Sequence, residues 1–277
     1  MAKAHGLGND FLLVAREAAP PRPEEWVPRV CERHTGVGAD GLILFTPVDR
    51  SAVRMTLVNA DGGEAEISGN GLRCLAAYAV SRGLVDGAHT VVTAAGPRPV
   101  EVSAVGGTRF RVVTDLGAPI LDSASIPITV DPPRCPVLRH SLSAAGRSFE
   151  VTSTSMGNPH CALFFPEEPV TDALLREIGP ALEHHPAFPR RTNVEFVTPV
   201  SRQELRVRFW ERGVGYTRAS GTGAASAAVA AMLNALVDRE VRVVCDGGVL
   251  EVSWPEGGHV RQVGEVEILF EGEWLGP

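Results

Sequence analysis

The chain has 277 residues, of which 44% are hydrophobic and 21% are charged, and its formal net charge is −7 at pH 7. These proportions are typical of a globular protein, and an acidic balance without a basic cluster argues against a nucleic-acid partner. The longest weakly polar run, residues 224–235, is too short to cross a bilayer, and no apolar signal segment follows the N-terminus. We therefore expect a cytoplasmic protein with no membrane partner, long enough for two domains of about 100–150 residues each.

The rarest chemical groups of the chain also exclude several classes of site. Its five cysteines are widely spaced without a Cys-x-x-Cys pair, which predicts neither a zinc site nor a disulfide framework. His34, His140 and His160 are isolated in the sequence, so we expect no metal. Lys3 is the single lysine, and a pyridoxal phosphate enzyme needs a lysine for its Schiff base. An extreme N-terminal position is a poor one for that lysine, and we expect no cofactor.

Short β-rich runs separated by glycine and proline predict most of the secondary structure. In chain order, we expect strands over residues 11–14, 41–45, 53–58, 90–93, 109–113, 161–165, 194–197, 205–209, 241–244, 249–254 and 266–270. A cluster of prolines within residues 115–133 marks the expected boundary between the two halves.

A repeat at long range interrupts these strands. Residues 68–85 and 220–237 are identical at seven of 18 positions, at a constant offset of 152 residues. Each copy begins Ser-Gly-x-Gly and continues with helix-forming residues that carry few charges, which predicts a buried helix capped by serine. The sequence thus predicts an α+β protein of two pseudo-symmetric domains, each a mostly antiparallel sheet wrapped around one central helix.

The two predicted helix starts are candidate binding sites. A helix N-terminus presents free backbone N–H groups and the positive end of the helix dipole, and glycine lets a ligand approach closely. Ser68 and Ser220 could therefore face one carboxylate from two sides. The alternative is that both serines are simple N-caps, and the presence of two copies favours the binding site.

Asparagines in glycine-containing loops are the remaining candidates. They are Asn9, Asn59, Asn158 and Asn193, and Glu211-Arg212 precedes the second helix start. Each asparagine alone is typical of a turn, but together with one arginine and one glutamate they would suit a zwitterionic substrate. The segment 36–41 fits Gly-x-Gly-x-x-Gly, yet a strand follows it instead of a helix, which argues against dinucleotide binding.

Seven segments in this order resemble the diaminopimelate epimerase family: His5-Gly-Leu-Gly-Asn-Asp-Phe11, His34-Thr-Gly-Val-Gly-Ala-Asp-Gly-Leu42, Asn59-Ala-Asp-Gly62, Gly69-Asn-Gly-Leu-Arg-Cys74, Met156-Gly-Asn-Pro-His160, Arg191-Thr-Asn-Val-Glu-Phe196 and Glu211-Arg-Gly-Val-Gly215. The resemblance implies a cofactor-independent interconversion of LL- and meso-diaminopimelate, for lysine and peptidoglycan synthesis. It also implies a homodimer whose chain forms two β-barrels, each around a central helix, with the amino-acid substrate between them. The implied domains are residues 1–117 with a C-terminal strand at about 263–277, and residues 118–262.

The resemblance also implies residue roles. Gly69, Asn70, Gly221 and Thr222 match the cradle of the substrate's α-carboxylate. The positions that hold its other polar groups are matched by Asn9, Asn59, Asn158, Asn193, Glu211 and Arg212. His160 and Glu211 match residues that tune the two catalytic thiols of the family. Tyr216 stands where the family usually has glutamate.

The catalytic thiols themselves are replaced, because the two family cysteines fall on Ser68 and Ser220. A cysteine thiol has a pKa of about 8.5 and is readily ionised at a helix N-terminus, whereas a serine hydroxyl is scarcely ionised. We expect activity to be impaired, since a base matched to its task contributes about 10²–10⁴-fold in rate. Three readings stay open: an epimerase with both cysteines exchanged, a paralogue acting on another amino acid, or a non-catalytic amino-acid binder.

Overall fold

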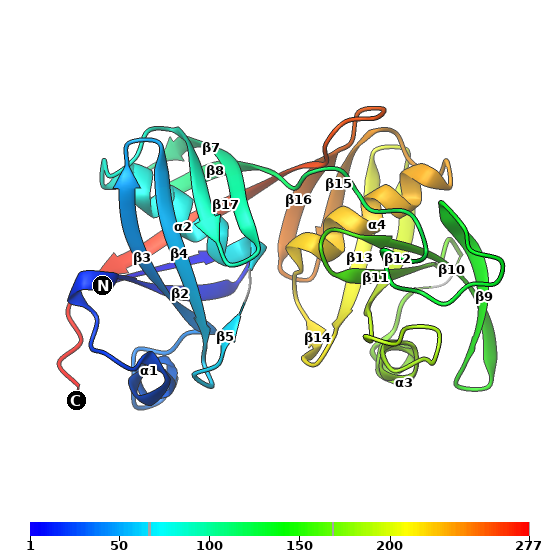
Figure 1. The fold of residues 1–277 in the computed structure, drawn as a ribbon, viewed down its shortest axis with the longest axis horizontal. Coiled ribbons are helices and arrows are strands. Elements are labelled where there is room, and N and C mark those ends of the chain that lie inside the picture. The colour runs from blue at the N-terminus through cyan, green and yellow to red at the C-terminus, as the bar shows by residue number, and fades with distance from the viewer. Residues whose placement is uncertain (66–67, 168, 277) are drawn as a thin grey trace. The chain divides into compact units, whose positions relative to one another are not determined.

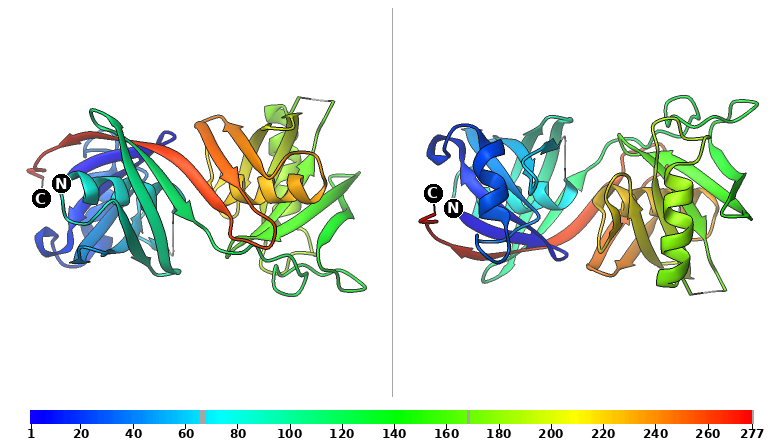
Figure 2. Two further views of the ribbon diagram at one scale, coloured as in Figure 1. Left: turned by 90° about the horizontal axis from the view of Figure 1, so that it is seen from above. Right: turned by 90° about the horizontal axis from the view of Figure 1, so that it is seen from below.

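The computed structural model describes residues 1–65, 68–167 and 169–276, so the predicted C-terminal range 263–277 ends on one residue outside the description. The chain divides into two compact units, shown in Figures 1 and 2. Unit 1 contains residues 1–115 together with those from Val263 onward, and unit 2 contains Leu116–Gln262.

Unit 1 is an eight-stranded closed barrel. Its strands are β1 (Ala2–Gly6), β2 (Asn9–Ala15), β3 (Gly41–Asp49), β4 (Ala52–Asn59), β6 (Ala88–Thr93), β7 (Gly96–Gly106), β8 (Arg109–Asp115) and β17 (Arg261–Glu271). Each pairs with the next in this order, and β17 pairs back onto β1. Only the β2–β3 and β4–β6 pairs are parallel, and the short β5 (Glu64–Ala65) extends β4. The closed ring leaves no unpaired sheet edge between these strands.

Helix α2 (Gly69–Ser81) lies in the core of unit 1, as expected from its few charges. Nine of its thirteen residues are buried, and they pack against inward-facing residues of the barrel strands such as Phe11, Ile43 and Met55. The alternating burial along β8 shows the same barrel from the strand side, because one face points to the core and the other to solvent.

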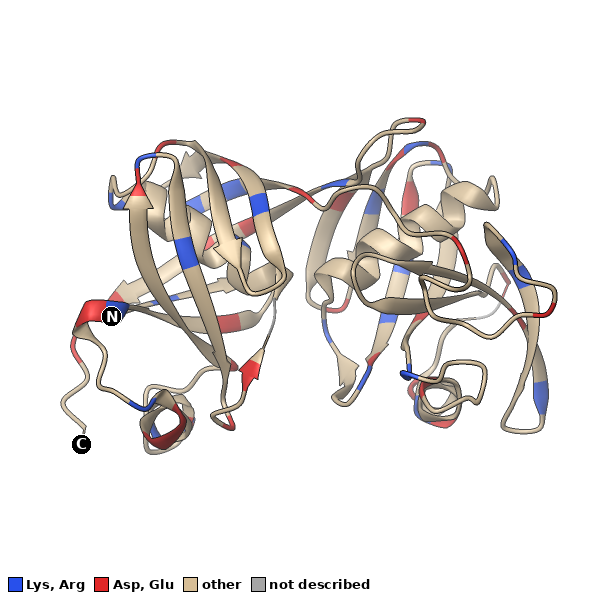
Figure 3. Cartoon of the chain, in the orientation of Figure 1, with Lys and Arg blue, Asp and Glu red and all other residues tan. Residues whose placement is uncertain are grey.

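Unit 2 repeats the plan. Its strands are β9 (Val137–Ala144), β10 (Arg147–Ser155), β11 (Pro159–Phe164), β12 (Asn193–Ser201), β13 (Glu204–Glu211), β15 (Glu240–Cys245) and β16 (Gly248–Ser253). Each pairs with the next, with parallel pairs at β11–β12 and β13–β15, and β14 (Gly215–Thr217) extends β13. Helix α4 (Gly221–Leu233) has no charged residue and is buried on almost every side, and Figure 3 draws it without charge.

The predicted α+β fold with two pseudo-symmetric halves is confirmed, and the symmetry extends to side-chain contacts. In unit 1, Arg50 donates from Nε to Asp86 Oδ1 at 3.1 Å and from Nη1 to the Gly83 carbonyl. In unit 2, exactly 152 residues later, Arg202 donates from Nε to Asp238 Oδ1 at 2.8 Å and from Nη1 to the Ala235 carbonyl. The arginine after β3 or β12 thus closes the same corner in both units.

Each half contains the predicted central helix and, in addition, an outer helix that was not predicted. Helix α1 (Pro23–Cys31) packs its buried residues, including Trp26 and Val30, outside the barrel of unit 1. Helix α3 (Asp172–Glu183) is capped by Thr171 and packs in unit 2 against Trp210. Figure 2 shows both at the outside of their units. None of the helices among residues 1–65, 68–167 and 169–276 is long and apolar enough to cross a membrane.

Candidate functional site

The N-terminus of α2 is the first of the two candidate binding positions predicted from the sequence. Ser68 has extended backbone angles, and its Oγ accepts a hydrogen bond from the Gly71 N–H at 3.1 Å, so it is the predicted N-cap. A Cβ at Gly71 would lie 3.1 Å from Ile43 Cδ1, so glycine lets the first turn sit against the barrel wall. Gly69 and Asn70 are the first two residues of α2, and the N–H groups of a helix's first turn have no partner within the helix, which suits an anion.

The N-terminus of α4 is the second candidate position, and it has the same N-cap geometry. Ser220 Oγ accepts from the Gly223 N–H at 3.2 Å, and Ser220 is buried. A Cβ at Gly223 would lie 2.9 Å from Ser220 Oγ and 3.0 Å from the Phe209 ring, so only glycine fits beside this cap. Gln262 Nε2 donates to the Gly221 carbonyl at 2.7 Å and ties this turn to β17.

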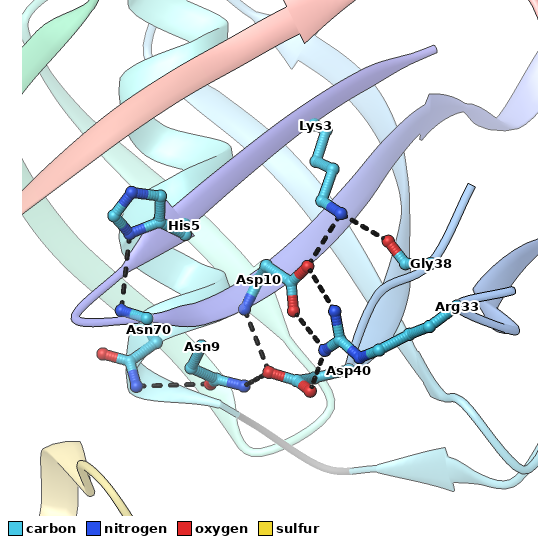
Figure 4. Close-up of polar contacts among 9 residues, drawn as sticks. Lys3, His5, Asn9, Asp10, Arg33, Gly38, Asp40 and Asn70 are labelled. Carbon is cyan, nitrogen blue, oxygen red and sulfur yellow. Dashed lines mark hydrogen bonds and ion pairs between the residues drawn. The ribbon is translucent and has the colours of Figure 1, made fainter. Parts of the chain in front are cut away.

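In unit 1, the structure brings two of the predicted asparagines together at the start of α2. Asn70 Nδ2 donates to Asn9 Oδ1 at 3.2 Å, from the first turn of α2 to the first residue of β2 (Figure 4). Asn59, at the end of β4, is exposed, and its backbone closes the turn to Gly63.

A buried trio of ionisable groups lies in unit 2. His160 Nδ1 is 2.6 Å from Glu195 Oε1, and its Nε2 is 3.0 Å from Asn158 Oδ1. The side chains of His160 and Glu195 are each 1% exposed. Burial raises the pKa of Glu195, while the charge of His160 and its hydrogen bond lower it in part.

Glu211 is the third member of the trio and lies next to Ser220. Burial raises the pKa of its carboxyl, and hydrogen bonds with Thr217 and Ser220 and the charge of His160 lower it in part. Thr217 Oγ1 donates to Glu211 Oε1 at 2.5 Å. A carboxyl whose pKa is raised by burial and that lies beside a hydroxyl can exchange a proton with it.

The other predicted residues of unit 2 lie at the start of β12, in the turn after β13 and in the first turn of α4. Asn193, the first residue of β12, donates from Nδ2 to the Pro159 carbonyl at 2.9 Å and accepts at Oδ1 from the Arg212 N–H at 3.0 Å. The exposed Arg212 guanidinium donates to the Arg190 carbonyl. Thr222 follows Gly221 in the first turn of α4, half-buried.

Tyr216, which departs from the family pattern, is part of a surface cluster. Its hydroxyl donates to Asp246 Oδ2 at 2.8 Å, and the Arg208 guanidinium lies 5.4 Å from its ring centre. Arg208 also donates to Asp246 and to Asp172 at the start of α3. The position at which the resemblance implies glutamate thus carries a hydroxyl that donates a hydrogen bond to the adjacent carboxylate of Asp246.

Several residues that hydrogen-bond to the predicted site residues were not themselves predicted: Asp40, Arg73, Glu195, Thr217 and Gln262. Glu195 lies in a quoted motif, two residues after Asn193 on the strand that pairs in parallel with the strand of His160. The parallel pairing could have suggested their contact. Among residues 1–65, 68–167 and 169–276, no three His, Cys, Asp or Glu residues gather where they could hold a metal ion.

Solved structures of other proteins share the fold of this chain. A predicted epimerase from Pseudomonas aeruginosa has this fold, with a TM-score of 0.69 at 20% identity over 100% of this chain and 99% of that one. A hydroxyproline epimerase from Agrobacterium vitis matches with a TM-score of 0.66 at 13% identity, over 98% of this chain and 90% of that one.

Sequence comparison identifies the family. The model of the family described as diaminopimelate epimerase matches residues 1–121 and 152–269. The diaminopimelate epimerase of Desulforudis audaxviator is 47% identical over 99% of this chain and 98% of its own length. That of Pelotomaculum thermopropionicum is 44% identical over 98% of this chain and 97% of its own length. The chain belongs to the diaminopimelate epimerase family.

Proposed function

We propose that this protein is an isomerase that interconverts LL- and meso-diaminopimelate by a two-base exchange of the α-proton without a cofactor. The observation that carries the proposal is the pair of serine-capped helix starts, 152 residues apart, in a chain of this family. The substrate's α-carboxylate would accept hydrogen bonds from the N-terminal turns of α2 and α4, at Gly69, Asn70, Gly221 and Thr222.

The remaining polar groups of the substrate would meet the amide side chains and the exposed guanidinium of Arg212. Asn9, Asn59, Asn158 and Asn193 offer both donors and acceptors, which suits a second amino and carboxylate group. Arg212 can fork onto the distal carboxylate, and Glu211 can accept from an ammonium group.

The proton balance of the reaction requires two groups. One removes the α-proton from one face, leaving a carbanion at the α-carbon. The other delivers a proton to the opposite face, so the configuration inverts and the two groups exchange protonation states. We propose Ser68 and Ser220 for these positions, with His160 and Glu211 as the groups that supply or accept their protons.

Serine at both positions is expected to impair this cycle. An alkoxide is scarcely populated near neutral pH, so proton removal needs a neighbouring base acting through the hydroxyl. A second candidate follows from the same two residues: a non-catalytic binder of diaminopimelate, which would keep the carboxylate cradle and the amides but not the thiols. A paralogue acting on another amino acid would keep the cradle alone.

We further propose that the protein works in the cytoplasm and as a homodimer. Its five cysteines are widely spaced in the sequence, and four of them are buried, which suits a reducing compartment. The homodimer is carried over from the family. Size-exclusion chromatography with light scattering tests it directly.

Proton NMR in D2O tests the function. LL-diaminopimelate is incubated with the unaltered chain, with a Ser68→Cys/Ser220→Cys double variant and with a Ser81→Cys control at the far end of α2. We expect slow or no loss of the α-proton signal with the unaltered chain, rapid loss with the double variant and no gain with the control. Binding of LL-diaminopimelate without exchange in either protein would favour the binder. Neither binding nor exchange by the double variant would refute the proposed substrate.

A further inference from the structure

Asn9 and Asn70 are members of a hydrogen-bonded chain whose two ends are charged. The buried Arg73 guanidinium, one turn further along α2, donates from Nη2 to Asn70 Oδ1. At the other end, Asn9 Nδ2 donates to Asp40 Oδ2 at 2.7 Å, as Figure 4 shows for the part from Asn70 to Asp40.

The chemistry of the two ends fixes the direction of every bond between them. A guanidinium can only donate, so Asn70 must present its carbonyl oxygen to Arg73 and its amide nitrogen to Asn9. An ionised carboxylate can only accept, so Asn9 must present its nitrogen to Asp40 and its oxygen to Asn70. Asparagine oxygen and nitrogen are nearly alike in shape, and here neither amide can rotate by half a turn without losing bonds at both ends.

Asp40 is itself held in place from several sides. Its Oδ2 also accepts from the Asp10 N–H at 3.1 Å, and its own N–H donates to the Asp10 carbonyl at 2.9 Å. Arg33 Nη2 donates to Asp40 Oδ1 at 2.7 Å and to Asp10 Oδ1 at 2.8 Å. Asp40 is exposed, so its fixed position comes from these contacts and not from packing.

The asparagines of unit 2 are set differently. Asn193 lies between two backbone groups, a carbonyl and an N–H, which fix its amide without any charge. Asn158 contacts His160 Nε2, a ring nitrogen that donates or accepts according to its protonation. Only in the chain from Arg73 to Asp40 do two charged side chains determine the orientation of binding-site amides.

We propose that Asp40 and Arg73 are positioning residues, which orient Asn9 and Asn70 so that each presents a fixed donor and acceptor pattern to the substrate. After these bonds, Asn9 and Asn70 each retain one amide N–H and one oxygen lone pair. The inference rests on the proposed function for the ligand that is bound, but the amide orientation is a property of the free protein.

The Asp40→Asn variant tests the proposal, because asparagine keeps the shape of Asp40 and can donate as well as accept. In isothermal titration with LL-diaminopimelate, the affinity of the variant should be about tenfold lower than that of the unaltered chain, or lower still. This is the size expected for losing a charged hydrogen bond at a binding group. Asp49→Asn is the matched control, since Asp49 is an exposed aspartate of the same unit whose carboxylate accepts hydrogen bonds from Ser51 in its own turn. It should bind as the unaltered chain does.

Two further readouts separate positioning from a general structural role. In ¹H–¹⁵N spectra of the free protein, the signal of the Asn9 side-chain amide, assigned through Asn9→Ser, should move in Asp40→Asn and stay in the control Asp49→Asn. In the Ser68→Cys/Ser220→Cys background, Asp40→Asn should raise KM by about the same factor as Kd and change kcat little. If Asp40→Asn does not fold, Asp40→Ala removes the acceptor and carries the same expectations.

The outcomes distinguish this proposal from the function on which it rests. Unchanged affinity together with an unmoved Asn9 amide signal in Asp40→Asn would overturn the positioning role. Should the unaltered chain bind no diaminopimelate, the proposed function fails, and the Asn9 amide signal still decides whether Asp40 fixes the orientation.

Discussion

The ionised carboxylate of Asp10 should stabilise the folded state of unit 1. This stabilisation should be lost in acid, and it should be absent from the Asp10→Asn variant. Asp10 Oδ2 lies 2.9 Å from Lys3 Nζ, and Arg33 donates to its two oxygens at 3.2 and 2.8 Å. Burial raises the pKa of Asp10, but hydrogen bonds and charges from Arg33 and Lys3 lower it more, from 3.8 to about 2. The side chain is 11% exposed, so solvent screens these contacts only weakly.

The size and sign follow from proton linkage. A fall of nearly two pKa units at about 1.4 kcal/mol each corresponds to about 2 kcal/mol that favours the folded state. Because the folded-state pKa lies below the unfolded one, this stability is fully present above about pH 5 and is lost as the pH falls through 4 towards 2. Asparagine cannot ionise, so the variant should be less stable than the unaltered chain at pH 6 and should lose less on acidification.

Urea unfolding at pH 6, 4 and 3, followed by circular dichroism, measures this difference. The free energy of unfolding of the unaltered chain should fall between pH 6 and pH 3 by about 1–2 kcal/mol more than that of Asp10→Asn. Asp61→Asn is the control, since the Asp61 carboxylate accepts only within its own turn, from Gly63 N–H. Equal pH dependence in the unaltered chain and Asp10→Asn would refute the reasoning.

Three further changes test the packing and the buried groups of unit 2. Gly179→Ala should destabilise the protein by about 1–3 kcal/mol in urea unfolding, because the new Cβ would lie 2.6 Å from the Trp210 ring, and a result near zero would contradict this packing. Ser220→Ala should cost about 1 kcal/mol through the lost N-cap, measured by calorimetry, with Ser220→Gly costing less. Glu195→Gln should shift the low-field imidazole N–H proton signal of His160 in NMR spectra, and persistence of that signal unchanged would exclude the buried contact.

The central helices were predictable because the information for them is local. Serine at the cap, glycine in the first turn and an uncharged body are all properties of adjacent residues, and both helices begin where these signals place them. Helix α3 carries a comparable local signal, with Thr171 as cap and apolar residues at 174, 175, 178 and 182, so it was predictable from the sequence as well. Helix α1 was harder, because Arg22 at its start makes no capping bond and Pro28 lies inside it.

The supporting groups of the site could not be read from local sequence. Asp40 meets Asn9 across 31 positions, and Glu195 meets His160 across 35, so both contacts depend on which strands pair. Parallel pairing of β2 with β3, and of β11 with β12, creates them. A residue such as Arg73, fully buried beside the cap, would be read from sequence alone as a solvated side chain of a helix.

The position of Glu211 should make the two serines unequal in their ability to transfer a proton in the proposed reaction. Its carboxyl, with a pKa raised by burial, lies beside the Ser220 hydroxyl, which can pass a proton from an acid to a substrate without itself becoming charged. Removing the α-proton is the harder step, because it requires a base, and such a base must be a group that ionises near neutral pH. We therefore expect Ser68→Cys alone to restore more α-proton exchange with LL-diaminopimelate than Ser220→Cys alone, measured by NMR in D2O at matched protein concentration. Faster exchange by Ser220→Cys would show that Glu211 does not serve Ser220 as a proton donor.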